Sequence, residues 1–344
     1  RGTMSTRHDD NGALSPGRIA MGLLLGGAAA AGGWMLYSAL GVDHHMPLPP
    51  ALNSEQERFA GRMSRYLNAY VDRTASGRPL VLIHSINAAA SAYEMRPIFE
   101  YYRARRPVYA LDLPGYGFSE RADRAYSPEV FKEAILDLLR LRVNEPADVV
   151  ALSLGGEFAA LAALEAPELF HSLTLISPTG FSRRERQPGS QQASGNSKSD
   201  RLLALFTNRL WSQAFYDLLA TRQVIRYYLR KSFVGPVDEG MVEYGHLTAH
   251  QPGARHAPLH FISGKLFTPN IRQVAYEKLE LPVLVIYDQD PYTNFELLPE
   301  LVAARRNWQA TRIAPSRGLP HFERMPDTAN ALDAFWLAIE RQSV

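Results

Sequence analysis

The stretch that decides the fold is Asp148-Val149-Val150-Ala151-Leu152-Ser153-Leu154-Gly155-Gly156-Glu157. Its first residues form an apolar, β-branched run, which predicts a strand buried on both faces. The run passes directly into Ser153, two glycines and an alanine-rich helical pattern. A turn this tight needs small neighbours, and it aims the serine hydroxyl outward near a helix N-terminus. Ser153 is therefore the candidate nucleophile. Ala151 stands where the G-x-S-x-G motif has its first glycine, and a helix-capping serine is the alternative interpretation.

Similar apolar runs recur along the chain and alternate with helical patterns. The runs cover residues 80–84, 107–113, 148–152, 172–177, 282–287 and 311–314, and the helical patterns cover residues 94–103, 128–141, 156–165, 299–305 and 328–342. Strand and helix in alternation predict a mostly parallel, doubly wound α/β sheet. We also expect an outer strand over residues 65–72, for which the end of a helix that starts at Ser54 is the alternative.

One long segment, residues 182–281, interrupts this alternation because it contains no buried strand pattern. Its first part, Ser182–Ser199, is polar and its remainder is helical and rich in aromatic residues, which predicts a polar loop followed by a helical cap. The cap would separate two parts of one catalytic core, residues 59–181 and 282–344. Ligands of open α/β sheets bind at the carboxyl ends of the strands, so we expect the cap to cover that edge.

The candidate acid and base follow the last two strand patterns. Asp288-Gln289-Asp290-Pro291 follows the run at 282–287, and His321 lies between the last run and the C-terminal helical pattern. A histidine there can accept the serine proton, and an aspartate can fix its tautomer. We expect Asp290 to be the acid, with Asp288 as the alternative. The order Ser153, Asp290, His321 is the order found in proteins with the strand–serine–helix turn.

The oxyanion site is expected from backbone amides beside the serine. The N–H of Leu154, directly after the nucleophile, is one donor, and the N–H of Ile86 in the loop His84-Ser85-Ile86-Asn87 is the other. His84 itself is interpreted as a buried histidine that holds this loop through hydrogen bonds.

Together these segments resemble the α/β-hydrolase superfamily over about residues 60–344, and in particular bacterial serine hydrolases with a helical cap. Asp112-Leu113-Pro114-Gly115-Tyr116-Gly117-Phe118-Ser119 resembles the D-x-P-G-x-G-x-S turn of that superfamily, and His321 with Glu323 and Pro326 resembles its C-terminal histidine segment. The resemblance implies the α/β-hydrolase fold, a Ser-His-Asp triad, a cap and no cofactor. A serine nucleophile separates the chain from the dehalogenase and epoxide-hydrolase branches, which use aspartate.

The N-terminal part predicts a membrane segment. Residues 19–40 contain no charged side chain and, as a helix, would extend about 33 Å. They follow an Arg-containing tail (residues 1–18) and precede a proline-rich linker (residues 41–58). The distribution of basic residues predicts a single-pass anchor with the catalytic domain on the outer, periplasmic or extracytoplasmic side. A signal peptide cleaved near Ala39-Leu40-Gly41, followed by secretion, is the first alternative, and a helix buried in the fold is the second.

Composition narrows the function classes. The 344 residues carry a net charge of +2 and no long basic run, which argues against a nucleic-acid partner. The chain has no cysteine, which excludes disulfides and thiolate chemistry, and His44-His45 lacks further ligands for a metal. From the candidate nucleophile, base and acid, together with the resemblance, we expect hydrolysis of a small-molecule ester through an acyl-enzyme. An acyltransferase, a thioesterase or a C–C bond hydrolase could use the same residues, and a non-catalytic, membrane-tethered binding protein is the alternative of another class. The sequence gives no signal for the oligomeric state.

Overall fold

The computed structural model describes residues 30–183 and 194–342. The chain forms two compact units, Arg1–Val42 and Asp43–Val344. In the small unit a helix runs from residue 30 to residue 41. The large unit holds the sheet and the other helices, and it carries the whole candidate site.

The prediction of a membrane anchor over residues 19–40 is wrong. Among the described residues, no helix is both long and apolar enough to cross a bilayer. Residues 19–29 lie outside the described residues, and the described helix begins at residue 30. A spanning helix needs about 20 predominantly apolar residues, and this segment is rich in glycine and alanine. The location of the catalytic domain on the outer side of a membrane depended on this anchor and is overturned with it.

The large unit is built on one eight-stranded sheet with the order β1-β2-β4-β3-β5-β6-β7-β8. The strands are β1 (Glu55–Phe59), β2 (Leu67–Asp72), β3 (Leu80–Ile83), β4 (Val108–Asp112), β5 (Ala147–Leu152), β6 (Phe170–Ile176), β7 (Val283–Gln289) and β8 (Trp308–Arg317). β1 and β2 run antiparallel to their neighbours, and all pairs from β4 to β8 are parallel. The predicted mostly parallel α/β sheet is thereby confirmed.

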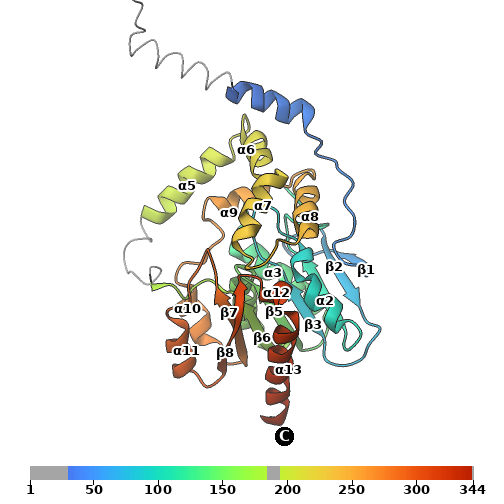
Figure 1. Ribbon diagram of the computed structural model, residues 1–344, viewed down its shortest axis with the longest axis vertical. Helices are drawn as coiled ribbons and strands as arrows, with labels where there is room; N and C mark the ends of the chain where they lie inside the picture. Colours follow the sequence, from blue (N-terminus) through green and yellow to red (C-terminus); the bar gives the residue numbers. More distant parts are fainter. Residues whose placement is uncertain (1–29, 184–193, 343–344) are drawn as a thin grey trace, which may run out of the picture. The chain divides into compact units, whose positions relative to one another are not determined.

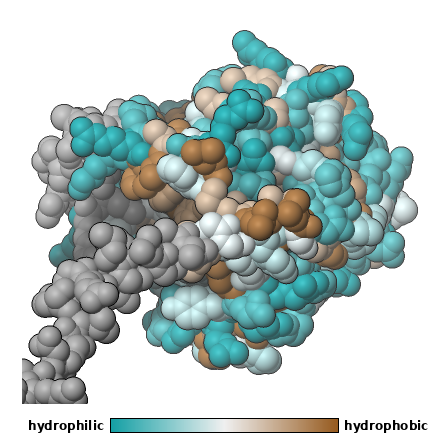
Figure 2. Space-filling model, turned by 90° about the horizontal axis from the view of Figure 1, so that it is seen from above, coloured by the Kyte–Doolittle hydropathy of each residue, from teal (hydrophilic) through white to brown (hydrophobic). Residues whose placement is uncertain are grey.

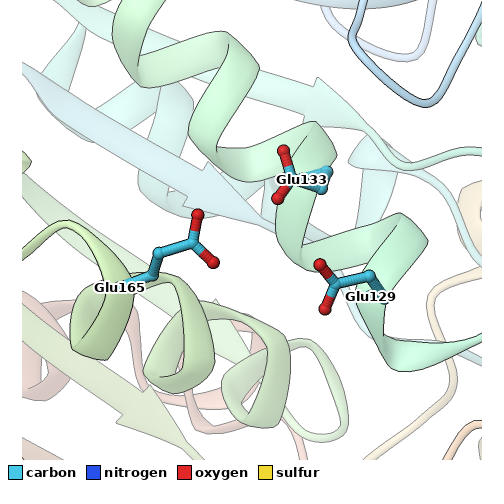
Figure 3. Close-up of side chains that lie close together, drawn as sticks. All are labelled: Glu129, Glu133 and Glu165. Atoms are coloured by element: carbon cyan, nitrogen blue, oxygen red, sulfur yellow. The ribbon is translucent and has the colours of Figure 1, made fainter.

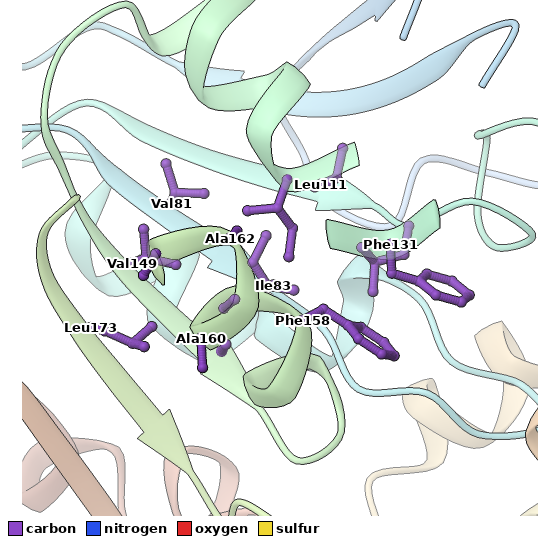
Figure 4. Packing of buried hydrophobic residues seen from close by; sticks show 14 of the residues in the cluster. Val81, Ile83, Leu111, Phe131, Val149, Phe158, Ala160, Ala162 and Leu173 are labelled. Atoms are coloured by element: carbon purple, nitrogen blue, oxygen red, sulfur yellow. The ribbon is translucent and has the colours of Figure 1, made fainter. Parts of the chain in front are cut away.

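Helices cover both faces of the sheet, which explains the uninterrupted apolar runs of its central strands. α3 (Pro128–Leu138) and α4 (Gly155–Glu165) pack on one face, and α2 (Arg96–Tyr102) and α13 (Met325–Gln342) pack on the other (Figure 1). Successive residues of a strand point to opposite faces. In β5, accordingly, Val149 faces the α3–α4 side (Figure 4) and Val150 faces the α2–α13 side.

Helices without a strand fill the segment between β6 and β7, as the sequence predicts, over its described part. They are α5 (Ser194–Phe206), α6 (Ser212–Leu219), α7 (Arg222–Lys231), α8 (Glu239–Ala249), α9 (His256–Ile262), α10 (Ile271–Val274) and the short 3₁₀ helix η5 (Tyr276–Lys278). α6 to α9 lie together at one end of the sheet (Figure 1). Residues 184–193 of the expected polar loop lie outside the described residues, and residues 194–199, which we also expect in that loop, begin α5.

Hydrophobic side chains on the cap are exposed singly or in small groups. They include Leu210, Trp211, Tyr227, Tyr228 and Phe267. Figure 2 looks down on this side and shows hydrophobic clusters separated by hydrophilic side chains. Scattered apolar residues are normal on a protein surface, so this pattern alone does not identify a docking site.

Candidate active site

The serine turn has the strained geometry expected of an exposed nucleophile. Ser153 follows β5 directly and has a φ of 50°, which is unusual for any residue but glycine. Its backbone N–H donates to the Ile176 carbonyl at 2.8 Å, which fixes the turn to β6. The Ser153 side chain is half-buried and lies at the N-terminus of α4. The positive end of that helix dipole favours negative charge at this position.

Close packing explains the glycine two residues after the serine. A Cβ atom on Gly155 would lie 2.3 Å from the backbone carbonyl oxygen of His84. No relaxation of a flexible side chain can relieve this contact, because the opposing atom belongs to the backbone. The start of α4 therefore touches the loop after β3, and this contact sets the spacing between the two proposed oxyanion donors.

A second serine has the same backbone strain but a different environment. Ser177 follows β6 with a φ of 46° and is buried, and its hydroxyl forms no hydrogen bond with any described residue. Pro178 follows it, and no helix of the described chain starts there. Of the two, only Ser153 is both partly accessible and adjacent to a helix N-terminus.

The two amides predicted for the oxyanion site are free. Neither Ile86 N–H nor Leu154 N–H donates to another residue of the described chain. The Ser85 N–H is engaged, because it donates to Glu94 Oε2 at 2.9 Å. The loop after β3 can therefore offer the Ile86 amide to a ligand but not the Ser85 amide.

His84 holds this loop, as its sequence interpretation proposes. The ring is fully buried, its Nδ1–H donates to the Ser85 carbonyl at 2.6 Å, and its Nε2 accepts from the Leu113 N–H at 3.0 Å. Burial lowers the pKa of His84 to about 4, so the ring is neutral near pH 7. Both ring nitrogens are used, which leaves His84 no free position for proton transfer.

Asp112 stabilises the D-x-P-G-x-G-x-S turn from inside. Its carboxylate accepts hydrogen bonds from the Phe118 N–H, the Ala92 N–H and the Asn68 side chain. Gly117 has a φ of 51°, and a Cβ atom there would lie 2.0 Å from Asp112 Cγ. Burial raises the pKa of Asp112 to about 6. Asp112 therefore stabilises both its own turn and, through the Ala92 N–H, the segment that follows β3.

Glu94 is a component of the site that the sequence interpretation missed. It lies in the 3₁₀ helix η1 (Ala92–Met95), and its buried carboxylate accepts from the Ser85 N–H and, at 2.7 Å, from Asn87 Nδ2. Burial raises the pKa of Glu94 above its ordinary value. The only signal in the sequence is an acidic residue at the start of a helical pattern, which is also typical of a surface position.

The two candidate acids differ in their contacts. Both oxygens of Asp288 are engaged, one by Arg312 Nε at 2.7 Å and the other by the Ser316 N–H at 2.9 Å. Asp290 uses Oδ1 to accept from the Tyr292 and Thr293 amides. Its Oδ2 has no hydrogen bond among the described residues and faces Gly318. Burial raises the pKa of Asp290. Asp290 therefore has a free oxygen and Asp288 does not.

His321 lies fully buried on the short helix α12 (Pro320–Glu323), between β8 and α13. Its Nε2 is 2.7 Å from the backbone carbonyl oxygen of Glu94, and because a carbonyl only accepts, Nε2 carries the proton. Its Nδ1 has no hydrogen-bond partner in the described chain. Burial lowers the pKa of His321 to about 4, so the ring is neutral near pH 7, as a general base must be.

The described contacts do not complete a triad. Within the described chain, His321 forms no hydrogen bond with Ser153 or with Asp290. The hydrogen bond to Glu94 nevertheless brings His321 close to the segment that follows β3, because Glu94 lies in η1, directly after β3. His321 itself follows β8, which is at the other side of the sheet. β5, which ends at Ser153, is the direct neighbour of β3 in the sheet. All three predicted residues therefore follow the carboxyl ends of strands at one edge.

The cap directly contacts the loop after β3, residues 84–90, which contains the candidate oxyanion donor Ile86 and is called the oxyanion loop below. Tyr216 on α6 donates its hydroxyl to the Ala88 carbonyl at 2.7 Å. A Cβ atom on Gly245 of α8 would lie 3.4 Å from Ala89 Cβ, which is ordinary packing distance. Tyr116, from the core, donates to the Asn87 carbonyl at 3.1 Å. The loop is thus held between core and cap.

A separate cluster of carboxylates lies on α3 and α4, away from these residues. Glu129, Glu133 and Glu165 point toward one another (Figure 3). The ammonium group of Lys132 lies among them, 2.8 Å from Glu129 and 3.7 Å from Glu133, and it also pairs with Glu165. Because a lysine already compensates their charge, we interpret the cluster as an ion-pair network.

Comparison with known proteins gives a family match over most of the chain. A model of the Alpha/beta hydrolase family matches residues 80–331. The 2-hydroxymuconate semialdehyde hydrolase of Pseudomonas sp. (strain CF600) is 32% identical over 111 residues, which are 32% of this chain and 39% of that protein. A pimeloyl-(acyl-carrier protein) methyl ester esterase of Xylella fastidiosa (strain 9a5c) is 30% identical over 125 residues, or 36% of this chain and 46% of that protein. The chain thus spans less than half of these relatives.

Solved structures share the fold over a longer range. A 2-hydroxy-6-oxo-6-phenylhexa-2,4-dienoate hydrolase from Rhodococcus sp. strain RHA1 has a TM-score of 0.62 at 21% identity, covering 82% of this chain and 98% of that one. A serine hydrolase involved in carbazole degradation has a TM-score of 0.64 at 16% identity, covering 83% and 99%. At such identities the likeness shows the fold alone.

Proposed function

Because this chain belongs to the alpha/beta hydrolase family, we propose that it is a serine hydrolase that cleaves carboxylic esters through an acyl-enzyme on Ser153. One observation carries the proposal: a strained, partly accessible serine lies at a helix N-terminus, the next residue has an unpaired amide (Leu154 N–H), and the loop that this helix contacts has another (Ile86 N–H). Unpaired amides beside a nucleophile can bind the oxyanion of a tetrahedral intermediate. The esterase among the relatives supports an ester substrate.

In the proposed reaction, Ser153 Oγ attacks the ester carbonyl carbon and gives its proton to His321. The negative charge on the carbonyl oxygen is stabilised by the Ile86 and Leu154 amides. The protonated imidazole then donates to the leaving alcohol. In the second half of the reaction His321 takes a proton from water, the water oxygen attacks the acyl carbonyl carbon, and the proton returns to Ser153 Oγ as the carboxylic acid leaves. Since Nε2 donates to Glu94, the imidazole lone pair lies on Nδ1 in the described orientation. Nδ1 is therefore the nitrogen that accepts the Ser153 proton in this orientation, and Nε2 could accept it only after the ring had changed tautomer and left the Glu94 carbonyl.

We propose Asp290 as the acid of the triad, supported by its free Oδ2. Asp290→Asn is expected to lower kcat by about 10²-fold or more, because the imidazolium loses its charge partner, with little change in melting temperature. Asp288→Asn is the matched control. It removes the charge of a buried carboxylate that accepts from the exposed Arg312 and from the Ser316 N–H, so it should lower the melting temperature while kcat changes by less than about threefold. Ester assays and thermal melts of both variants separate the roles, and the opposite pattern would make Asp288 the acid.

A fluorophosphonate probe, which phosphonylates activated serines, tests the proposed function. We expect one adduct per chain, located on the peptide that contains Ser153 by mass spectrometry. A panel of p-nitrophenyl esters with increasing acyl length then defines the substrate class. A folded protein that gains no adduct and hydrolyses no ester would contradict the proposal and favour a binding protein that kept the fold. An adduct on Ser177 would identify that residue, at the end of β6, as the nucleophile in place of Ser153.

A C–C bond hydrolase is the second candidate, supported by the relative that is a 2-hydroxymuconate semialdehyde hydrolase. It would use the same serine and oxyanion donors. The two candidates differ in substrate, so a conjugated ketone acid such as 2-hydroxymuconate semialdehyde, assayed beside the ester panel, distinguishes them.

A further inference from the structure

We infer that Glu94 is a positioning residue that holds both the oxyanion loop and His321, so that one buried residue sets the geometry of the two. The inference rests on the proposed function and deepens it. It is carried by three contacts: the Ser85 amide and the Asn87 side chain donate to the carboxylate, and His321 Nε2 donates to the backbone carbonyl.

The carboxylate binds the loop on both sides of Ile86. Oε2 accepts from the residue before Ile86, and Oε1 accepts from the residue after it, at 2.9 Å and 2.7 Å. Asn87 is further held because its Nδ2 lies 3.1 Å from Ser85 Oγ and its Oδ1 accepts from the Ala89 N–H at 2.8 Å. With both neighbours fixed, the direction of the Ile86 N–H is fixed as well. Because the Ser85 N–H donates to Glu94, only the Ile86 N–H of these two amides can donate to a substrate oxygen.

The absence of a cation at Glu94 indicates that this arrangement is not an ordinary ion pair. Among the described ion pairs, none includes Glu94, and its carboxylate meets only neutral donors. A buried carboxylate without a cation costs desolvation energy and contributes little to stability, in contrast to the Lys132 network on α3 and α4. Such a group is more readily explained by the geometry it imposes on its two donors.

The backbone of the same residue orients the base. The Glu94 carbonyl selects the His321 tautomer with the proton on Nε2. A shift of η1 therefore moves the oxyanion loop and the imidazole together. Displacements of about 1 Å in a catalytic site can cost about 10²-fold in rate.

The test uses Glu94→Gln in the full chain, with p-nitrophenyl butyrate as substrate. Glutamine turns one acceptor oxygen into an NH₂ donor, which then faces either the Ser85 amide or the Asn87 side chain. We expect kcat to fall by about 10²-fold with KM within about threefold of the wild type, since the loss concerns the transition state. Adding Asn87→Asp offers the glutamine NH₂ an acceptor, so the double variant should recover kcat to within about tenfold of the wild type.

Glu133→Gln is the matched control, because it removes another buried carboxylate far from Ser153, and its kcat should equal that of the wild type. Amide hydrogen exchange tests the contact itself without a substrate: Ser85 N–H should exchange slowly in the wild type and faster in Glu94→Gln. A wild type that is labelled at Ser153 beside a Glu94→Gln variant with unchanged kcat would overturn this inference alone. A kcat loss that tracks the melting temperature and is not rescued by Asn87→Asp would also overturn it. A wild type without label or activity would refute the proposed function instead.

Discussion

Replacing Ser153 by alanine is expected to lower kcat for p-nitrophenyl butyrate by about 10⁴-fold or more, while the protein stays folded. Alanine has no oxygen to form the acyl-enzyme, and water positioned by the remaining groups is a poor substitute. The Ser153 N–H that anchors the turn to Ile176 belongs to the backbone and is unchanged by the substitution. The kinetic assay should therefore register a loss that thermal melting does not.

Two further variants sharpen this result. Ser177→Ala removes a hydroxyl from the same strained conformation at the end of the adjacent strand, so its kcat should stay within about threefold of the wild type. The double variant Ser153→Ala, His321→Ala should have the same kcat as Ser153→Ala alone. If His321 acts only by accepting the Ser153 proton, its removal costs nothing once the serine is absent. Additive losses in the double variant would mean that His321 acts on stability or binding and is not the base for Ser153.

Replacing Gly155 by alanine is expected to destabilise the fold by about 1–3 kcal/mol and to lower kcat by about 10²-fold. The new methyl group would lie 2.3 Å from the His84 carbonyl oxygen, so α4 and the loop after β3 have to move apart. That movement separates the Leu154 and Ile86 amides, which the proposed reaction needs at a fixed spacing. Chemical denaturation and ester kinetics measure the two effects independently.

The adjacent glycine provides the control for this substitution. A Cβ atom on Gly156 would meet only Leu175 Cδ2, the end of a flexible side chain, at 3.0 Å. Gly156→Ala should therefore cost less than about 1 kcal/mol and leave kcat near the wild-type value. Equal effects of both substitutions would show that the spacing between α4 and the loop is not what the proposed site depends on.

The central strands were predictable because burial on both faces leaves a continuous apolar run. β5 and β3 are buried at every position, and the apolar runs locate both to within one residue. The edge strand β1 falls mostly within the predicted linker instead, because Glu55-Gln56-Glu57-Arg58-Phe59 is mostly exposed and carries no periodic apolar pattern. Only its pairing with β2 makes it a strand, and pairing partners cannot be derived from local composition.

The sequence could propose candidate residues for the site but not their contacts. The ends of the predicted strands indicate Ser153, His321 and an aspartate as candidates, and the structure places all three after the carboxyl ends of strands at one edge of the sheet. The choice between Asp290 and Asp288 depends on which of the two carboxylates binds Arg312. The role proposed for Glu94 depends on its contacts with Ser85, Asn87 and the distant His321, and local sequence does not reveal such contacts. The membrane anchor failed for a different reason: residues 19–40 lack charge, but half of them are glycine or alanine. The described helix of this segment covers only residues 30–41, which is too short for a bilayer span.

The contact between Tyr216 and the Ala88 carbonyl has a consequence for how this cap can be altered. Because α6 and α8 contact the backbone of the oxyanion loop, the cap cannot be replaced without changing the contacts of that loop. A chimera that carried the cap of another family member would leave the Ala88 carbonyl without its donor and Ala89 without its packing partner Gly245. Attempts to change selectivity by cap exchange would thus alter reactivity at the same time, unless the transplanted helices brought an equivalent tyrosine and glycine.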